Sequence, residues 1–304
     1  MVLAAAIQLE AVIGDVAANL GKCAQLAAEA GRAGAKIIAL PEFFTTGIAF
    51  DPALRDAALP PEGAATELLR TLAHHYDALV GGSFLCRDKD GHVRNAYFAA
   101  DATGMIGRHD KDLPTMWENA FYIGGQDDGV FRAGTLNVGA AVCWELMRTR
   151  TARRMRAHVD LVMAGSGWWS IPPWRPRATF AAMERRNHQT ARAAAATFAK
   201  YVGAPVVHAP RTSANSAVPC PGSPSNIAAT LKAPPSSPTV PAASSPNAAP
   251  KKAQASFSAI STLGACHPRP RFPTDSGYTA GAHYPPRHGI TKGGTAVGGI
   301  AETW

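Results

Sequence analysis

Short apolar runs alternate with longer amphipathic segments along the first 210 residues of the chain. The apolar runs are of strand length and lie at 3–9, 35–42, 79–86, 95–104, 135–143, 159–165 and 205–209. Apolar positions at helical spacing occur at 18–35, 66–78 and 178–201. Because strands and helices alternate, the pattern predicts a layered α/β domain.

This pattern stops near residue 210. The remaining segment holds no sustained period of strand or helix, and 15 of the 24 prolines lie in 206–304. Such a composition buries too little apolar surface to offset the entropy of an ordered chain. We therefore expect a domain over 1–210 and a Pro/Ala/Ser-rich, disordered tail over 211–304. A second interpretation is that a GC-rich gene is read out of frame in this tail, which resequencing would decide.

The net charge of +8 is concentrated in the tail. From residue 206 onward there are 8 Lys and Arg but only 2 acidic residues, whereas the first 205 residues hold 22 basic and 20 acidic groups. This balance gives little support to nucleic-acid binding by the domain. The Arg-rich stretch at 148–156 is typical of a solvated helix face.

Other features of the composition favour a cytoplasmic protein without a membrane span. The chain has no run of about 18 apolar residues, and its opening residues are typical of a strand rather than a signal peptide. Its 5 cysteines are scattered without a C-x-x-C pair, which argues against a disulfide framework and a zinc site. We expect Cys23 and Cys86 to pack in the core.

Four polar residues, two of them at the ends of apolar runs, could support nucleophilic chemistry. Cys143 ends the run "LNVGAAVC", and Glu42 ends "IIALPE". Lys111 and Glu118 flank the proline turn in "HDKDLPTMWE". A thiol is mostly protonated at neutral pH, so it needs a base, and the anion formed by its attack needs a cation or N–H donors. Since α/β folds present catalytic side chains at strand ends, these residues are candidates for one site.

These motifs, together with the opening "AAIQLEAVIGDVAANL", resemble those of the carbon–nitrogen hydrolase (nitrilase) superfamily. The resemblance covers residues 2–210 and implies a Glu–Lys–Cys triad of Glu42, Lys111 and Cys143, with Glu118 as an auxiliary glutamate. It also implies a four-layer αββα sandwich. Members of the family usually pair as homodimers through a helix face, for which the helices near 148–157 and 178–201 are candidates.

The activity implied by the resemblance is hydrolysis of a non-peptide C–N bond without metal or other cofactor. Cys143 would form a thioester with a small amide, carbamoyl compound or nitrile, and an amide or carbamoyl substrate is slightly favoured. Glu42 would act as the general base, and Lys111 with the Trp144 backbone N–H would stabilise the oxyanion. Trp168 and Trp169 are expected to line the substrate pocket.

Two alternatives remain open from the sequence alone. The chain departs from the family pattern after residue 210, where relatives complete their second sheet, so we expect missing strands and an exposed sheet edge. The protein could then be an inactive or binding-only relative. The second alternative is a papain-like mechanism with His75, His109 or His208 as the base. The sequence also leaves open whether Glu145 supports the site or lies on the surface.

Overall fold

The computed structural model describes residues 2–168, 175–210 and 254–260, and these contain two β-sheets. The first has six strands in the order β10-β1-β2-β3-β4-β5. They are β1 (Val2–Gln8), β2 (Ile37–Glu42), β3 (Leu79–Arg87), β4 (Val93–Asp101), β5 (Gly104–Asp110) and β10 (Gln254–Ile260). Strands β1, β2 and β3 are parallel, whereas β4, β5 and β10 join through antiparallel pairs.

The second sheet has four strands in the order β6-β7-β8-β9. They are β6 (Val130–Ala133), β7 (Leu136–Val142), β8 (Leu161–Ser166) and β9 (Val206–Pro210). Strands β7, β8 and β9 are parallel, and β6 is antiparallel to β7. In α/β folds, binding sites form at the carboxyl ends of the parallel strands, where the following loops begin.

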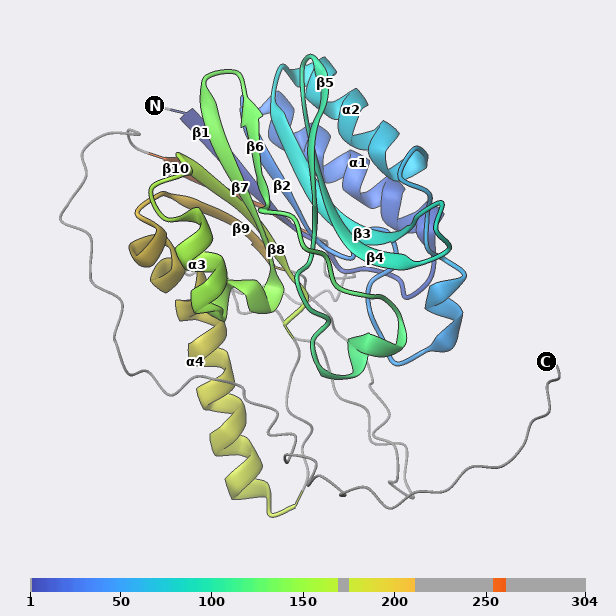
Figure 1. Ribbon diagram of the computed structural model, residues 1–304, viewed down its shortest axis with the longest axis vertical. Coiled ribbons are helices and arrows are strands. Elements are labelled where there is room, and N and C mark those ends of the chain that lie inside the picture. Colours follow the sequence, from blue (N-terminus) through green and yellow to red (C-terminus); the bar gives the residue numbers. More distant parts are fainter. Residues whose placement is uncertain (1, 169–174, 211–253, 261–304) are drawn as a thin grey trace, which may run out of the picture. The chain divides into compact units, whose positions relative to one another are not determined.

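Helices cover the outer faces of both sheets, as Figure 1 shows. Helices α1 (Val16–Arg32) and α2 (Ala64–Tyr76) lie on the first sheet, and α3 (Thr149–Met155) and α4 (Arg177–Val202) lie beside the second. The Asp15 side chain accepts a hydrogen bond from the Ala18 amide and so caps α1 at its first turn. The result is the four-layer αββα sandwich that the sequence motifs implied.

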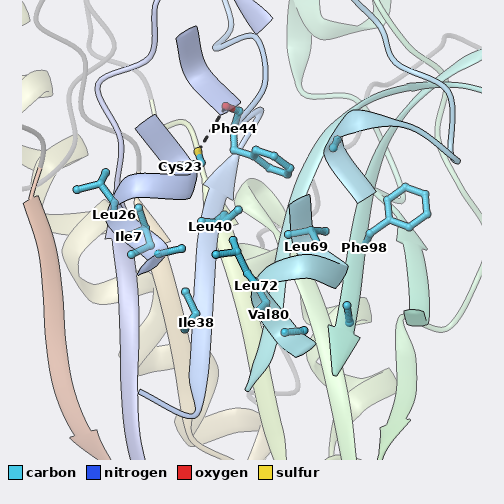
Figure 2. Close-up of a cluster of buried hydrophobic side chains, with 14 of the residues drawn as sticks. Ile7, Cys23, Leu26, Ile38, Leu40, Phe44, Leu69, Leu72, Val80 and Phe98 are labelled. Carbon is cyan, nitrogen blue, oxygen red and sulfur yellow. Dashed lines mark hydrogen bonds between the residues drawn. The ribbon is translucent and has the colours of Figure 1, made fainter. Parts of the chain in front are cut away.

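A hydrophobic core fills the space between the first sheet and its helices (Figure 2). Ile38 and Leu40 project from β2 toward Leu26 of α1 and Leu72 of α2. Burying one such side chain contributes about 1.5–3 kcal/mol. Cys23 belongs to the same cluster, and its thiol lies 3.9 Å from the Phe44 carbonyl oxygen. Cys23 and Cys86 are both buried in this core, as the sequence predicted.

Small residues bring the two sheets close together at the ends of β2 and β8. All six residues of β2 are buried because helices cover one face and the second sheet covers the other. A Cβ added at Gly165 of β8 would lie 2.6 Å from the Glu42 amide nitrogen. Because only glycine allows this approach, the end of β8 lies directly against the end of β2.

The structure adds three strands to those expected from the sequence. Strand β5 was not expected because Arg108, His109 and Asp110 interrupt its apolar pattern, and β6 is only four residues long. Strand β10 lies in the range 211–304, where no regular element was expected, and pairs antiparallel with β1. The rest of that range lies outside the described residues.

The Arg-rich helix is only partly solvated, which corrects the expectation for 148–156. Arg150 and Arg153 are exposed. Arg154 instead lies 2.8 Å from the Asp112 carboxylate, and Arg148 lies 3.5 Å from it. Of the helices in the described ranges, none is both long and apolar enough to cross a lipid bilayer.

Candidate active site

Glu42 is buried at the carboxyl end of β2, and three separate segments hold its carboxylate. Oε1 accepts hydrogen bonds from Asn95 Nδ2 on β4 and from Lys111 Nζ, both at 2.9 Å. Oε2 accepts one from the Gly167 amide, just after β8, at 2.7 Å. Both sheets therefore contribute to the position of this one side chain.

Lys111 follows β5 directly and is completely buried. Its ammonium lies 2.9 Å from Glu42 Oε1 and 2.8 Å from Glu118 Oε2. The same nitrogen lies 5.8 Å from the centroid of the Tyr122 ring. A buried ammonium is tolerated only with such partners, so the two carboxylates fix it in place.

Glu118 lies in the 3₁₀ turn Met116–Ala120, and hydrogen bonds from residues at the two ends of this turn hold its side chain in a buried position. Its Oε2 accepts a hydrogen bond from the Thr115 amide at 2.9 Å, which caps the turn. The Tyr122 hydroxyl donates to the same oxygen. Glu118 and Lys111 therefore occupy defined positions within one hydrogen-bond network.

Cys143 is the first residue of the 3₁₀ turn Cys143–Met147, which follows β7 without a loop. It is 3% exposed, and its φ of +53° lies in the left-handed region. Phe43, the residue after Glu42, has a φ of +54°. Such backbone conformations cost about 1–3 kcal/mol in non-glycine residues and tend to occur at functional sites.

The pKa values of these side chains show that they share one electrostatic environment. Burial raises the pKa of the Cys143 thiol well above its usual value, the Glu42 carboxylate raises it further, and Lys111 opposes both. Burial also raises the pKa of Glu42, against the effect of Lys111. Burial would lower the pKa of Lys111, but the carboxylates of Glu118 and Glu42 raise it well above its usual value.

This set of groups can supply a nucleophile, a proton acceptor and a fixed positive charge at one place. The thiol is protonated at neutral pH and needs a base at the moment of attack. The Glu42 carboxylate is close enough to raise the pKa of Cys143, which makes it the candidate for this base. The Lys111 ammonium remains charged and can stabilise a developing anion.

The tryptophans expected at the pocket differ in their surroundings. Trp144 follows Cys143 directly and is 44% exposed. Its ring centroid lies 5.6 Å from that of Trp168, at an interplanar angle of 40°. Trp168 is buried, and its indole nitrogen donates to Asn187 Oδ1 of α4 at 2.9 Å. Trp169, the third tryptophan expected there, lies outside the described residues.

Sequence reasoning missed three groups that the structure places around Glu42 and Lys111. Asn95 and the Gly167 amide bind Glu42, and Tyr122 binds Glu118. Of these three, only Tyr122 could have been expected from the sequence, because it lies four residues after Glu118 and such neighbours meet in a helical turn. Asn95 and Gly167 reach the site through strand pairing and sheet packing, which a local pattern does not report.

Of the three histidines considered for a papain-like mechanism, one is exposed and two have polar partners other than Cys143. His75 is exposed on α2. His109 directs Nδ1 to Asp127 at 2.5 Å and Nε2 to Glu145 at 3.0 Å. His208 Nε2 lies 2.7 Å from the Ser166 hydroxyl.

One cluster of described residues has the spacing of a metal site. Candidate ligand atoms of His109, Asp112 and Glu145 lie within 4.8 Å of one another. Asp112 is already paired with Arg154, and the Glu145 carboxylate accepts backbone hydrogen bonds from Asp112 and Val142. Asp112 Oδ1 and both Glu145 oxygens are therefore already occupied by protein donors, which leaves few of the cluster's ligand atoms for a metal ion.

Comparison with known proteins identifies relatives of this chain. A family model described as carbon-nitrogen hydrolase matches residues 3–209. A nitrilase from Pyrococcus abyssi is 29% identical over 185 residues, which are 59% of this chain and 69% of the relative. An omega-amidase, YafV, from Yersinia enterocolitica is 32% identical over 134 residues, 43% of this chain and half of the relative.

Solved structures share the fold at lower sequence identity. A CN-hydrolase superfamily protein from Xanthomonas campestris, with an arsenic adduct in its active site, has a TM-score of 0.57 at 20% identity, covering 70% of this chain and 78% of its own. An amidase variant from Nesterenkonia sp. AN1, after Michael addition of acrylamide at its active-site cysteine, has a TM-score of 0.53 at 18% identity. That match covers 70% of this chain and 79% of the amidase.

Proposed function

Because the chain belongs to the carbon–nitrogen hydrolase family, we propose that it hydrolyses a small amide through a thioester on Cys143. The observation that carries the proposal is the Lys111 ammonium, held at 2.9 Å from Glu42 and 2.8 Å from Glu118 beside a buried thiol. A carbamoyl compound is a second substrate of the same chemistry, and a nitrile a third. The relatives include proteins named as amidases and as a nitrilase, so the choice rests on experiment.

The proposed reaction begins when the substrate carbonyl carbon meets Cys143. Glu42 takes the thiol proton as the S–C bond forms, and the carbonyl oxygen becomes an oxyanion. Lys111 and the Trp144 backbone N–H stabilise that charge. The amine or ammonia then leaves with the proton held by Glu42, and a thioester remains.

Hydrolysis of the thioester reuses the same groups. Glu42 removes a proton from water, the hydroxide attacks the thioester carbon, and Cys143 leaves and is protonated again. Glu118 positions Lys111 during both half-reactions, because its carboxylate accepts a hydrogen bond of 2.8 Å from the same ammonium that binds Glu42. No redox or group-transfer partner is needed for this sequence.

Ammonia release by the purified full-length protein tests the proposal. The panel contains acrylamide and butyramide, which solved amidase relatives carry, together with a carbamoyl amino acid and butyronitrile. Cys143→Ala is expected to abolish release, and Glu42→Gln to lower kcat by about 10²–10⁴-fold through loss of the base. Cys86→Ala is the matched control, because Cys86 is also buried but lies in the core of the first sheet.

Two outcomes would contradict the proposal. A folded protein that releases no ammonia from any substrate would favour the inactive or binding-only alternative. Full turnover in Glu42→Gln, with loss in His109→Ala, would favour a histidine base instead.

The same proposal includes a homodimer and a cytoplasmic location. The first half of α4, residues 177–189, is mostly exposed and offers a surface on which a second copy of the chain can pack. Cys23, Cys86 and Cys143 are free thiols, which suits a reducing compartment.

A further inference from the structure

Glu145 is a buried carboxylate that the proposed reaction does not use. It lies two residues after Cys143, in the same 3₁₀ turn, and is 1% exposed. Buried carboxylates are rare without a compensating charge or several hydrogen bonds. Its contacts therefore indicate what it does.

The two oxygens of Glu145 bind two separate segments of the active site. Oε2 accepts a hydrogen bond from the Val142 amide at 2.7 Å, and Oε1 accepts one from the Asp112 amide at 2.8 Å. Val142 directly precedes Cys143, and Asp112 directly follows Lys111. One carboxylate thus links the segment that carries the thiol to the segment that carries the ammonium.

A histidine and a second carboxylate complete a buried row behind Glu145. His109 Nε2 lies 3.0 Å from Glu145 Oε2, and His109 Nδ1 lies 2.5 Å from Asp127. Burial would lower the pKa of His109, but Glu145 and Asp127 raise it to about 10. The imidazole therefore carries a positive charge at neutral pH and balances the Glu145 carboxylate.

Asp127 is itself fixed to the strand that leads to Lys111. Its Oδ2 accepts a hydrogen bond from the Asp110 amide at 2.9 Å, and its Oδ1 accepts one from the Gly129 amide at 2.9 Å. The row Asp127–His109–Glu145 therefore begins and ends on backbone groups next to Lys111. Charge-assisted hydrogen bonds of this kind are shorter and stronger than neutral ones.

We propose that Glu145 is a positioning residue that sets the separation between the Cys143 thiol and the Lys111 ammonium, with His109 and Asp127 holding its carboxylate in place. This inference rests on the proposed function, since the separation matters for oxyanion stabilisation. Its bond to Val142 alone would only close the turn. The bond to Asp112 lies outside the turn and joins the two segments.

Three variants of the full-length protein test this role. Glu145→Gln keeps the shape of the side chain but removes its charge and one acceptor. Asp127→Asn weakens the far end of the row, where the side chain is 35% exposed and the substitution is better tolerated. The third variant combines both substitutions. Asp160→Asn is the matched control, because Asp160 accepts a bond from the Asn137 amide at the opposite end of β7.

We expect Glu145→Gln to lower kcat for butyramide by about 10²-fold, since small displacements of reacting groups have effects of this size. KM should change by less than about threefold, because Glu145 makes no contact with substrate in this mechanism. Asp127→Asn should lower kcat by about 3–10-fold, and the combined variant should match Glu145→Gln because the residues act as one unit. Asp160→Asn should retain wild-type kcat.

A second measurement separates this inference from the proposed function. Peptide mass spectrometry measures the rate at which iodoacetamide alkylates Cys143. This rate should differ from that of the wild type in Glu145→Gln and equal it in Asp160→Asn. This readout remains informative even if the wild type releases no ammonia. Unchanged kcat and alkylation in a folded Glu145→Gln variant would overturn the positioning role. If that variant does not fold, wild-type kcat in Asp127→Asn would overturn it.

Discussion

At the residue scale, Lys111 is the side chain on which the electrostatics of the site depend. It neutralises two buried carboxylates, and its own pKa is raised because Glu118 and Glu42 surround it. Removing one partner of a buried ion pair typically costs about 3–5 kcal/mol, because the remaining charge loses its compensation. The cost should depend on pH, since a carboxylate can take up a proton instead.

Lys111→Met is therefore expected to destabilise the protein more at about pH 8 than at about pH 5. Burial already raises the pKa of Glu42 in the folded protein. The free energy of unfolding therefore falls as the pH rises from the pKa of Glu42 in the unfolded chain to its pKa in the folded protein. Loss of the lysine raises that pKa further and extends the fall to higher pH. Urea unfolding at both pH values measures the difference.

Lys36→Met provides the control for that measurement. Lys36 pairs with Asp77 at 2.9 Å, but both side chains are at least half exposed. Exposed pairs contribute about 0–1 kcal/mol, so its effect should be small at both pH values. An equal loss of stability at both pH values in Lys111→Met would contradict the assignment of a charged Glu42 beside Lys111.

At the element scale, the packing of α1 against α2 depends on a glycine. A Cβ added at Gly31 of α1 would lie 2.3 Å from Cγ of Tyr76 at the end of α2. Gly21 lies in the same helix, but a Cβ added there would meet no atom within 4 Å. Helix propensity favours alanine at both positions, so tertiary packing alone distinguishes them.

We expect opposite effects from the same substitution at these two positions. Gly21→Ala should raise the free energy of unfolding by up to about 1 kcal/mol, because alanine is the better helix former. Gly31→Ala should lower it by about 1–3 kcal/mol, because the Tyr76 ring must move. Thermal unfolding of both variants gives the comparison, and an equal rise in Tm would disprove the close packing of α1 on α2.

At the scale of the whole molecule, the candidate site lies where the two sheets meet. Glu42 ends β2 and Lys111 follows β5 in the first sheet, whereas Cys143 and Gly167 follow strands of the second. Neither sheet by itself carries all of these candidate residues. The site therefore exists only when the sheets are packed against each other.

The proposed homodimer is a prediction at this same scale. We expect the full-length protein to have twice the monomer mass by light scattering, with α3 and α4 at the interface. Met183 on α4 is 47% exposed, and Met183→Asp should give monomers because it places a charge in the interface. Val12→Asp, at a 43% exposed position away from α4, should leave the dimer intact. A monomeric wild type would contradict this assembly.

Several features of the protein could be predicted from its sequence because they depend on local patterns. The alternation of apolar runs and amphipathic segments predicted the layered α/β domain and the strands that end at Glu42, Cys143 and Gly167, but not β5, which leads to Lys111. Glu42 and Cys143 became candidates because each ends an apolar run. Lys111 and Glu118 were predicted from their spacing around a proline turn and from the family motifs.

Only the tertiary structure decided which further groups join them. Asn95 and Gly167 reach Glu42 through the register of β4 and the close approach of β8, and Glu145 reaches Asp112 across the chain. Strand β10 likewise depends on the free edge of β1. Periodicity is a property of neighbouring residues, whereas these contacts depend on how distant segments align. Their hydrogen bonds therefore became visible only in the folded chain.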